Sequence, residues 1–184
     1  MAVCVALRSF DPAIAGVRRV TFADAVRDYQ EEVFGAALRI TGDRESALDV
    51  ASTTFLKAYR AFSRYDQTRP IRHWLLRIAT NEAISHARRR SRELRRRVDV
   101  ESGAEIVDGA AAPEEASVAR EARARIRAAV VGLPELYRVV IVLRYFNDLS
   151  VDEIAKITGR PPSTVGVQLL RGRALLRQAL GDAQ

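Results

Sequence analysis

The chain has little cysteine and histidine, and it has no long apolar run. Cys4 is the single cysteine, so no intramolecular disulfide can form. The two histidines, His73 and His86, have no Cys or His partners at ligand spacing, which argues against a zinc site. No apolar stretch approaches the roughly 20 residues of a membrane span. Residues 2–7 are too few for a signal-peptide core, so we expect a cytoplasmic protein without membrane insertion.

Motifs of catalysis are also missing from the sequence. It contains no nucleophile elbow, no phosphate-binding loop, no cluster of metal ligands and no paired carboxylates at a recognisable catalytic spacing. Pairs of Asp and Glu residues are expected on solvent-facing helix surfaces, where ion pairing with Arg is the ordinary outcome. We therefore expect a protein that is not an enzyme, uses no cofactor and takes no small-molecule substrate.

Positive charge is abundant and indicates a polyanionic partner. The formal net charge is +7 and the pI is about 10.3, values typical of proteins that bind nucleic acid. Lys57 and Lys156 are the only lysines, a bias that a GC-rich genome would produce, so the preference for Arg says less than the charge itself. With 184 residues, the chain can form one medium domain or two small ones.

Blocks of charge divide the chain into four parts. Residues 1–20 lack periodicity and form an extension, or reflect a start codon assigned too early, and residues 21–97 show helical periodicity that ends in a run of arginines. Residues 98–116 are acidic and contain Gly, Ala and Pro, which predicts a flexible acidic linker. Residues 117–184 are again helical. The sequence thus predicts an all-α protein in which two small helical domains are joined by a linker.

The first domain should contain three helices. Thr21 with Asp24 can cap the first one, which runs to about residue 40. A second helix spans 44–62, a polar loop covers 64–69, and Pro70 starts a third helix that continues into the arginines. On that third helix, a helical repeat of about 100° per residue gathers several polar side chains on one face.

That polar face has the residue types needed to hold nucleic acid. Arg77, Asn81 and Arg88 cluster there, and Trp74 lies at its edge. Arg binds phosphates, Asn offers a donor and an acceptor to a base, and an aromatic ring can stack on an unpaired base. The alternatives are that Trp74 belongs to the core and that each Arg is simply solvated.

The second domain contains a helix-turn-helix pattern. Apolar helix 136–146 is followed by a short helix 151–158 and a final Arg-rich helix 164–180. Ala155 is small where two helices would cross, Gly159 can adopt the left-handed conformation that ends a helix, and Val165 can fill the core between the helices. The second helix of such a motif enters the major groove of DNA. An ordinary helical hairpin would explain the same residues.

Taken together, the two domains resemble the extracytoplasmic-function (ECF) sigma factors of bacterial RNA polymerase. The similarity covers residues 22–180, with matching fragments in the right order. In the first domain these are 38–43, 47–50, 55–59, 69–79 and Asn81; in the second they are 133–134, 143–146, 149–150, 153–155 and 164–165.

The resemblance implies a promoter-specificity subunit with three contact surfaces. Residues expected at the −10 element, where a base is captured from the stack, are Arg64, Tyr65, Asp66, Arg69, Trp74, Arg77, Asn81 and Arg88. Residues expected at the −35 element are Ser163, Thr164, Val167, Gln168, Arg171 and Arg173, with Gln168 a candidate reader of adenine. Residues expected to bind the polymerase clamp are Asp49, Ser52, Thr53, Phe55 and Lys57.

The implied partners are promoter DNA, core RNA polymerase and an anti-sigma factor. On the polymerase, the contacts would be the clamp of the beta-prime subunit and the beta flap. Two departures from the family pattern affect these contacts. Ser52 and Thr53 replace the usual Gln and Glu of the clamp-binding helix, and 166–168 replaces the usual Lys, Ser and Arg of the recognition helix. Apolar contacts to thymine methyl groups or a protein-binding patch would explain the latter change.

Two other classes of protein are compatible with parts of this pattern. A helix-turn-helix regulator that binds operators without polymerase would explain the second domain and the charge, but not the first domain. A degenerate sigma-like adaptor that acts by protein–protein contact would explain the changes at Ser52, Thr53 and 166–168.

Overall fold

A computed structural model describes residues 20–98 and 117–181 of the chain. These parts are helical, and no strand occurs within them. The extension predicted at 1–20 and the acidic linker predicted at 98–116 fall almost wholly outside the described residues. In chain order the elements are α1 (Phe22–Thr41), α2 (Arg44–Ala61), the 3-10 helix η1 (Phe62–Arg64), α3 (Ile71–Val98), α4 (Ser117–Gly132), α5 (Glu135–Tyr145), α6 (Val151–Thr158) and α7 (Pro162–Gly181).

Short-range hydrogen bonds set the ends of the first helices. The Thr21 hydroxyl accepts from the Asp24 backbone N–H (3.1 Å), and the Asp24 carboxylate accepts from Thr21, as in a capping box. These hydrogen bonds, from the Thr21 side chain first and then from Arg27, lower the pKa of Asp24 to about 2. Gly42 ends α1 with a φ of 89°, and Asp43 caps α2 through the backbone N–H of Ser46 (2.8 Å). The predicted boundaries of α1 and α2 are therefore confirmed to within one residue.

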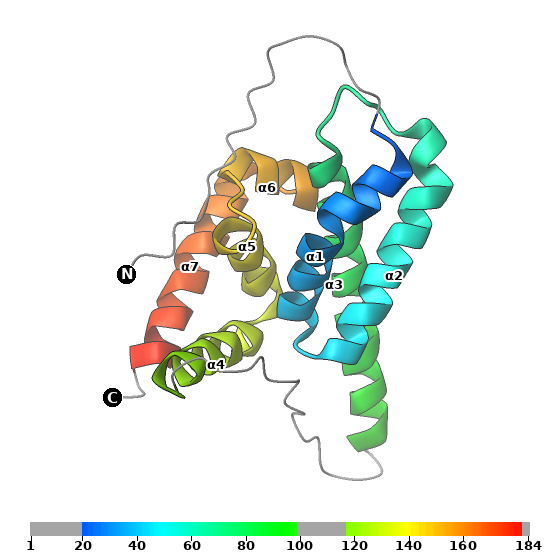
Figure 1. Ribbon diagram of the computed structural model, residues 1–184. Coiled ribbons are helices and arrows are strands. Elements are labelled where there is room, and N and C mark those ends of the chain that lie inside the picture. The colour runs from blue at the N-terminus through cyan, green and yellow to red at the C-terminus, as the bar shows by residue number, and fades with distance from the viewer. Residues whose placement is uncertain (1–19, 99–116, 182–184) are drawn as a thin grey trace.

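Helices α1, α2 and α3, with η1, form a first unit, shown on the right of Figure 1. Its own core consists of buried Ala25, Val33, Ala58, Ile71, Leu75 and Ala79, together with a rim of aromatic side chains. Ala at several of these positions allows the three helices to approach one another closely. The polar face of α3 is thereby left on the outside of this three-helix unit.

Helices α4 to α7 form a second unit, in which α6 and α7 make the predicted helix-turn-helix. Ser150 and Glu153 form a capping box at the start of α6, and Gly159 ends that helix with a φ of 68°. Ala155 and Val165 are buried between the helices, as their spacing predicted. Helix α7 begins at Pro162. The N–H that proline lacks would have no hydrogen-bond partner within the helix at this position.

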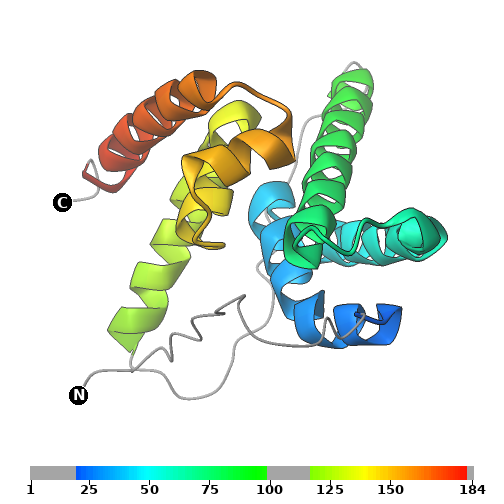
Figure 2. The same cartoon turned by 90° about the horizontal axis from the view of Figure 1, so that it is seen from above.

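The two units lie directly against each other (Figures 1 and 2), with α1 contacting α4 and α5, and α3 contacting α6. One continuous buried cluster includes Ile40 and Leu76 of the first unit and Leu133, Val140 and others of the second. Helix α7 lies on the side of the second unit that faces away from the first (Figure 2). The tertiary arrangement thus joins two units that the sequence separates by a linker.

Candidate nucleic-acid interface

The loop between η1 and α3 is held in shape by its own side chains. The Asp66 carboxylate accepts hydrogen bonds from the hydroxyl (2.6 Å) and the backbone N–H (3.0 Å) of Thr68, and these lower the pKa of Asp66. Arg69 Nε lies 3.2 Å from Asp66 Oδ2, and the Tyr65 hydroxyl donates to the carbonyl of Arg69. Asp66 therefore fixes the loop from within, whereas Arg64 and Arg69 are exposed to solvent.

A wall of aromatic rings supports this loop. The ring centroids of Tyr65 and Trp74 are 4.8 Å apart, and Phe62 stacks on Tyr65 at 5.9 Å. Phe22 makes edge-on contacts with Phe62 (5.5 Å) and Tyr59 (5.2 Å). Trp74 and Tyr65 are half-buried, so each ring belongs to the core of the first unit and also borders its surface.

The polar face of α3 is divided between solvent and the second unit. Arg77 and Asn81 are exposed and lie one turn apart on the same side of the helix. Arg88, two turns further along, has its Nε 3.1 Å from a carboxylate oxygen of Glu135 in α5. The structure therefore brings Arg77 and Asn81 together on a solvent-facing surface, and it turns Arg88 toward the second unit.

A polar hollow of about 900 Å³ lies between α2 and the C-terminal half of α3. Three expected clamp contacts, Asp49, Ser52 and Thr53, line it from α2, and Arg89 and Arg90 line it from α3. At its edge, Arg90 bonds to Asp43. Partial burial acts to raise the pKa of Asp43, but hydrogen bonds from Ser46 and the charge of Arg90 outweigh it and leave that pKa below its ordinary value.

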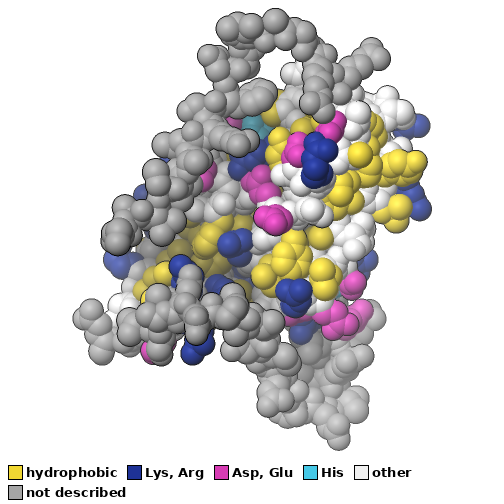
Figure 3. Space-filling model, viewed as in Figure 1, with side chains coloured by type: hydrophobic (Ala, Val, Ile, Leu, Met, Phe, Trp, Pro, Cys, Tyr) yellow, Lys and Arg dark blue, Asp and Glu magenta, His cyan; other side chains and the backbone are white. Residues whose placement is uncertain are grey.

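Two other expected clamp contacts point elsewhere. Phe55 is half-buried against the core of the first unit, and Lys57 forms an ion pair with Glu82 of α3. The exposed large apolar side chains on α2 are Leu48, Leu56 and Tyr59, and of these Leu56 lies one turn beyond Ser52 and Thr53. Leu56 follows Asp49 by seven residues, or about two helical turns, so helical periodicity predicts that it lies on the same face of α2. Figure 3 shows apolar side chains gathered on the side of the molecule that carries α2.

The recognition helix α7 presents a mixed surface to solvent. Ser163 and Thr164 are exposed in its first turn, and Val167 and Leu170 are 49% and 61% exposed. Arg171 and Arg173 are also exposed, but at 100° per residue their side chains leave the helix about 200° apart. Arg171 therefore shares a surface with Val167, and Arg173 lies on the opposite flank.

Gln168 departs from the expected role. It is only 7% exposed, and its Oε1 accepts a hydrogen bond of 2.9 Å from Arg160 in the turn that precedes α7. Because residue 168 follows Val165 by three positions, it shares the buried face of α7. The prediction that Gln168 is placed to read a base is wrong in this structure, since its amide holds the turn of the motif. The turn residue Arg160 is a contact that the sequence did not indicate.

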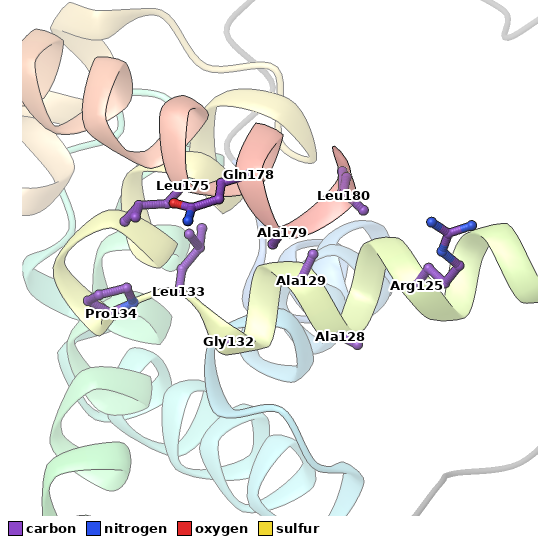
Figure 4. Close-up of a pocket in the computed structure, with 10 residues that line it drawn as sticks. All are labelled: Arg125, Ala128, Ala129, Gly132, Leu133, Pro134, Leu175, Gln178, Ala179 and Leu180. Atoms are coloured by element: carbon purple, nitrogen blue, oxygen red, sulfur yellow. The ribbon is translucent and has the colours of Figure 1, made fainter. Parts of the chain in front are cut away.

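A second hollow, of about 550 Å³, lies between α4 and α7 (Figure 4). Leu133 and Leu175 lie near each other at the end opposite Arg125, and Ala129 and Ala179 approach from the two helices. The lining is largely apolar, and Arg125 stands at one end. This hollow resembles a groove for an apolar protein segment more than a site for a small charged ligand.

Within residues 20–98 and 117–181, no three Cys, His, Asp or Glu side chains are grouped so that they could hold a metal ion. Over the same ranges, no helix combines the length and apolar character needed to cross a bilayer.

Two family models match the chain in the order in which the units occur. The Sigma-70 region 2 model matches residues 25–93, and the Sigma-70 region 4 model matches residues 123–176. The fold and these two regions define the chain as a sigma-type transcription initiation factor, with region 2 in the first unit and region 4 in the second.

Similar proteins identify the family within that class. The chain is 35% identical over 168 residues to the ECF RNA polymerase sigma factor SigW of Bacillus subtilis, covering 88% of this chain and 89% of that protein. It is 33% identical over 161 residues to the RNA polymerase sigma-H factor of Pseudomonas aeruginosa, covering 84% and 83% of the two chains. The chain belongs to the ECF sigma factor family, and its function is promoter-specific initiation of transcription.

Solved structures show the same fold. One is the sigma factor RpoE of Bartonella quintana in complex with the anti-sigma factor NepR. The match has a TM-score of 0.72 and 20% sequence identity, and it covers 89% of this chain and 98% of RpoE. Another is CnrH in complex with the cytosolic domain of CnrY. The match has a TM-score of 0.65 and 24% sequence identity, and it covers 89% of this chain and 89% of CnrH.

Proposed function

We propose that this sigma factor contacts its promoter through two surfaces, one on α3 and one on α7, and that it contributes recognition rather than catalysis. The observation that carries the proposal is the exposure of both surfaces in one chain: Arg77 and Asn81 on α3, and the first turn of a helix-turn-helix recognition helix on α7. A helix-turn-helix regulator without polymerase would have no use for the first surface.

At the −10 element, the exposed face of α3 and the neighbouring loop would hold an unpaired base. Extrusion of a base costs a few kcal/mol, which contacts from the protein must offset. Asn81 has the donor and acceptor to bond a base edge, and Arg64, Arg69 and Arg77 would bind the backbone phosphates. The loop fixed by Asp66 and Tyr65, with Trp74 below it, would form the wall against which the base rests.

At the −35 element, the first two turns of α7 would enter the major groove. Ser163 and Thr164 would bond bases or phosphates, and Val167 would contact a thymine methyl group. Arg171 would make the strongest contact, because it shares the surface of Val167. Arg173 lies on the opposite flank and would bind phosphate, and buried Gln168 would support the turn through Arg160.

Core polymerase would dock on the hollow between α2 and α3. Asp49, Ser52, Thr53 and exposed Leu56 would meet the clamp of the beta-prime subunit, with Phe55 and Lys57 supporting α2 from behind. The beta flap would contact the second domain. The functional domains would be 21–97 and 117–184, on either side of a linker at 98–116.

An anti-sigma factor is the natural inhibitor of such a chain. The sigma factors RpoE and CnrH, which share this fold, have been solved with the anti-sigma factor NepR and with the cytosolic domain of CnrY, respectively. The apolar hollow between α4 and α7 gives this chain a surface that a helix of such a partner could cover.

Run-off transcription tests the proposal. Bacterial core polymerase is assayed with and without the protein on fragmented DNA of the source genome, and discrete new transcripts are expected. Their start sites would define both promoter elements. Binding to core without transcripts would instead support the adaptor, and sequence-specific duplex binding without any binding to core would support the operator-binding regulator.

A further inference from the structure

One face of α7 is fixed against the second unit by small and apolar side chains. Val165, Leu169 and Gly172 are buried on this face. A Cβ built on Gly172 would lie 2.9 Å from a side-chain carbon of Ile141 in α5, so a larger residue here would push the two helices apart. Because this face is buried, the opposite face of α7 points away from the rest of the protein (Figure 2).

The outward face of α7 carries an apolar stripe, made of Val167, Leu170 and Ala174, with Ser163 at its N-terminal end. These residues recur at intervals of four, three and four positions, so at 100° per residue they lie within about 60° of one another around the helix. All four are exposed. Leu170, at 61%, is the most exposed large apolar side chain in the described part of the second unit.

Arginines border the apolar stripe, and no acid accompanies them. Arg171 and Arg173 are exposed on its two flanks, and Arg177 is exposed one turn after Arg173. Helix α7 contains no Asp or Glu, so its side chains carry positive charge only. An apolar stripe between cationic flanks complements the major groove of DNA, where phosphates form the walls and base edges form the floor.

The side chains of the apolar stripe can recognise one chemical feature of that floor. Val167, Leu170 and Ala174 have no hydrogen-bonding group, so they cannot replace the water on a polar base edge. A leucine over such an edge would leave donors or acceptors unpaired, which costs free energy. The apolar group that the major groove presents is the C5-methyl group of thymine. A leucine over that methyl group buries apolar surface on both partners.

The spacing within the apolar stripe suits neighbouring base pairs. Val167 and Leu170 are about 4.5 Å apart along the axis of α7, at a rise of about 1.5 Å per residue. Base pairs are stacked about 3.4 Å apart along DNA. A helix lying in the groove would therefore place these two side chains over base pairs that are adjacent or nearly so.

We infer that Val167 and Leu170 are specificity-determining residues that read the C5-methyl groups of thymines in the −35 element. This inference rests on the proposed promoter contact of α7, and it adds the base and the chemical group that are recognised. The arginines on the two flanks would hold the helix in the groove while the apolar stripe selects the sequence.

Deoxyuridine tests the inference, because it pairs as thymine does and lacks only the methyl group. Transcripts made by the wild-type holoenzyme first locate the −35 element, and its thymines are then replaced one at a time in a synthetic promoter. Loss of one contacted methyl group should weaken competition for the holoenzyme by about fourfold. Deoxyuridine placed between the two promoter elements is the control and should have no effect.

Variants of the apolar stripe assign each contact to a side chain. Leu170→Ala should weaken binding to the thymine promoter by about fourfold or more. It should have much less effect on the promoter that already lacks the contacted methyl group, because the effects of two groups in contact are not additive. Val167→Ala should behave in the same way toward a neighbouring thymine. Leu136→Ala, which removes an exposed leucine of α5, is the matched control and should affect neither promoter.

A −35 element without thymines, or one in which deoxyuridine has no effect, would overturn the inference. Full initiation by both Val167→Ala and Leu170→Ala would also overturn it, and would indicate that the apolar stripe faces a protein partner instead. Failure of the proposed function looks different, since the wild-type holoenzyme would then give no transcripts even from ordinary DNA, and the inference would fall with it.

Discussion

On α3, neighbouring side chains have opposite surroundings. Thr80 is fully buried, whereas Asn81, the next residue, is exposed beside Arg77. The exposed Asn81 side chain adds nothing to the core and is available for a ligand. At the residue scale, recognition is therefore separable from stability, and substitutions on these surfaces should alter function while leaving the fold intact.

Asn81→Ala should reduce open-complex formation more than polymerase binding, because it removes a base contact and leaves the hollow on α2 unchanged. Permanganate footprinting of the melted promoter measures the first, and titration of labelled protein with core polymerase measures the second. Gln30→Ala, an exposed amide on α1, is the matched control. Equal losses in both assays would exclude a specific role in holding the base.

Arg171→Ala should weaken −35-dependent initiation by about 1–3 kcal/mol if the guanidinium makes a bidentate base contact. Competition between promoters with intact and altered −35 elements measures the difference. Arg177→Ala removes the same charge from an exposed position further along α7 and should have little effect. If the two variants behave alike, Arg171 contributes only general charge.

Replacing Ser52 and Thr53 by Gln and Glu should tighten the complex with core polymerase. Both residues line the hollow on α2, and the longer side chains would restore the reach and the negative charge typical of the family. The dissociation constant of the holoenzyme measures the effect. An unchanged constant would mean that Asp49 and Leu56 suffice for docking.

At the scale of elements, the ends of the helices are set by single residues. Glu153 shows this at the start of α6, where hydrogen bonds from Ser150 keep its pKa below the ordinary value despite partial burial. Because the folded pKa is lowered, this cap stabilises α6 above about pH 4.5 and is lost as the pH falls through the folded value. The helix-turn-helix therefore depends on its caps as well as on its core.

Gly159→Ala should destabilise the protein by about 1–2 kcal/mol, because residue 159 has a φ of 68°, where a Cβ is strained. Gly166→Ala is the matched control, since it lies within α7 and an added Cβ there would meet no atom within 4 Å. That change should stabilise the helix by about 0.5–1 kcal/mol. Urea unfolding measures both, and the same sign for the two variants would contradict the argument.

At the scale of the whole molecule, two adjacent leucines distinguish the two cores. Leu75 is buried in the core of the first unit, and Leu76 is buried in the cluster shared with the second. Each change to Ala should cost about 2–5 kcal/mol. Hydrogen exchange should show that Leu76→Ala loosens α6, whereas Leu75→Ala loosens chiefly α1 to α3. Identical exchange patterns would mean that the two units do not share a core.

Much of the fold was predictable from local sequence. The capping pairs at Thr21 and Ser150, the glycine at 159 and helical periodicity gave the helices and the helix-turn-helix. The site was only partly predictable. Periodicity placed Arg77 with Asn81, and counted from Val165 it also places Gln168 on the buried face of α7. It did not indicate that Gln168 bonds to Arg160 or that Lys57 pairs with Glu82.

The sequence by itself determined the helices, their ends and the family, because caps, turns and periodicity act within a few residues of the chain. Only the tertiary structure decided which side chains meet across large distances in sequence. Glu32 and Asn147 are 115 residues apart, and Ile40 and Arg138 are 98 apart. No local rule specifies such pairs, because they form only when the apolar faces of several helices bury one another in a single cluster.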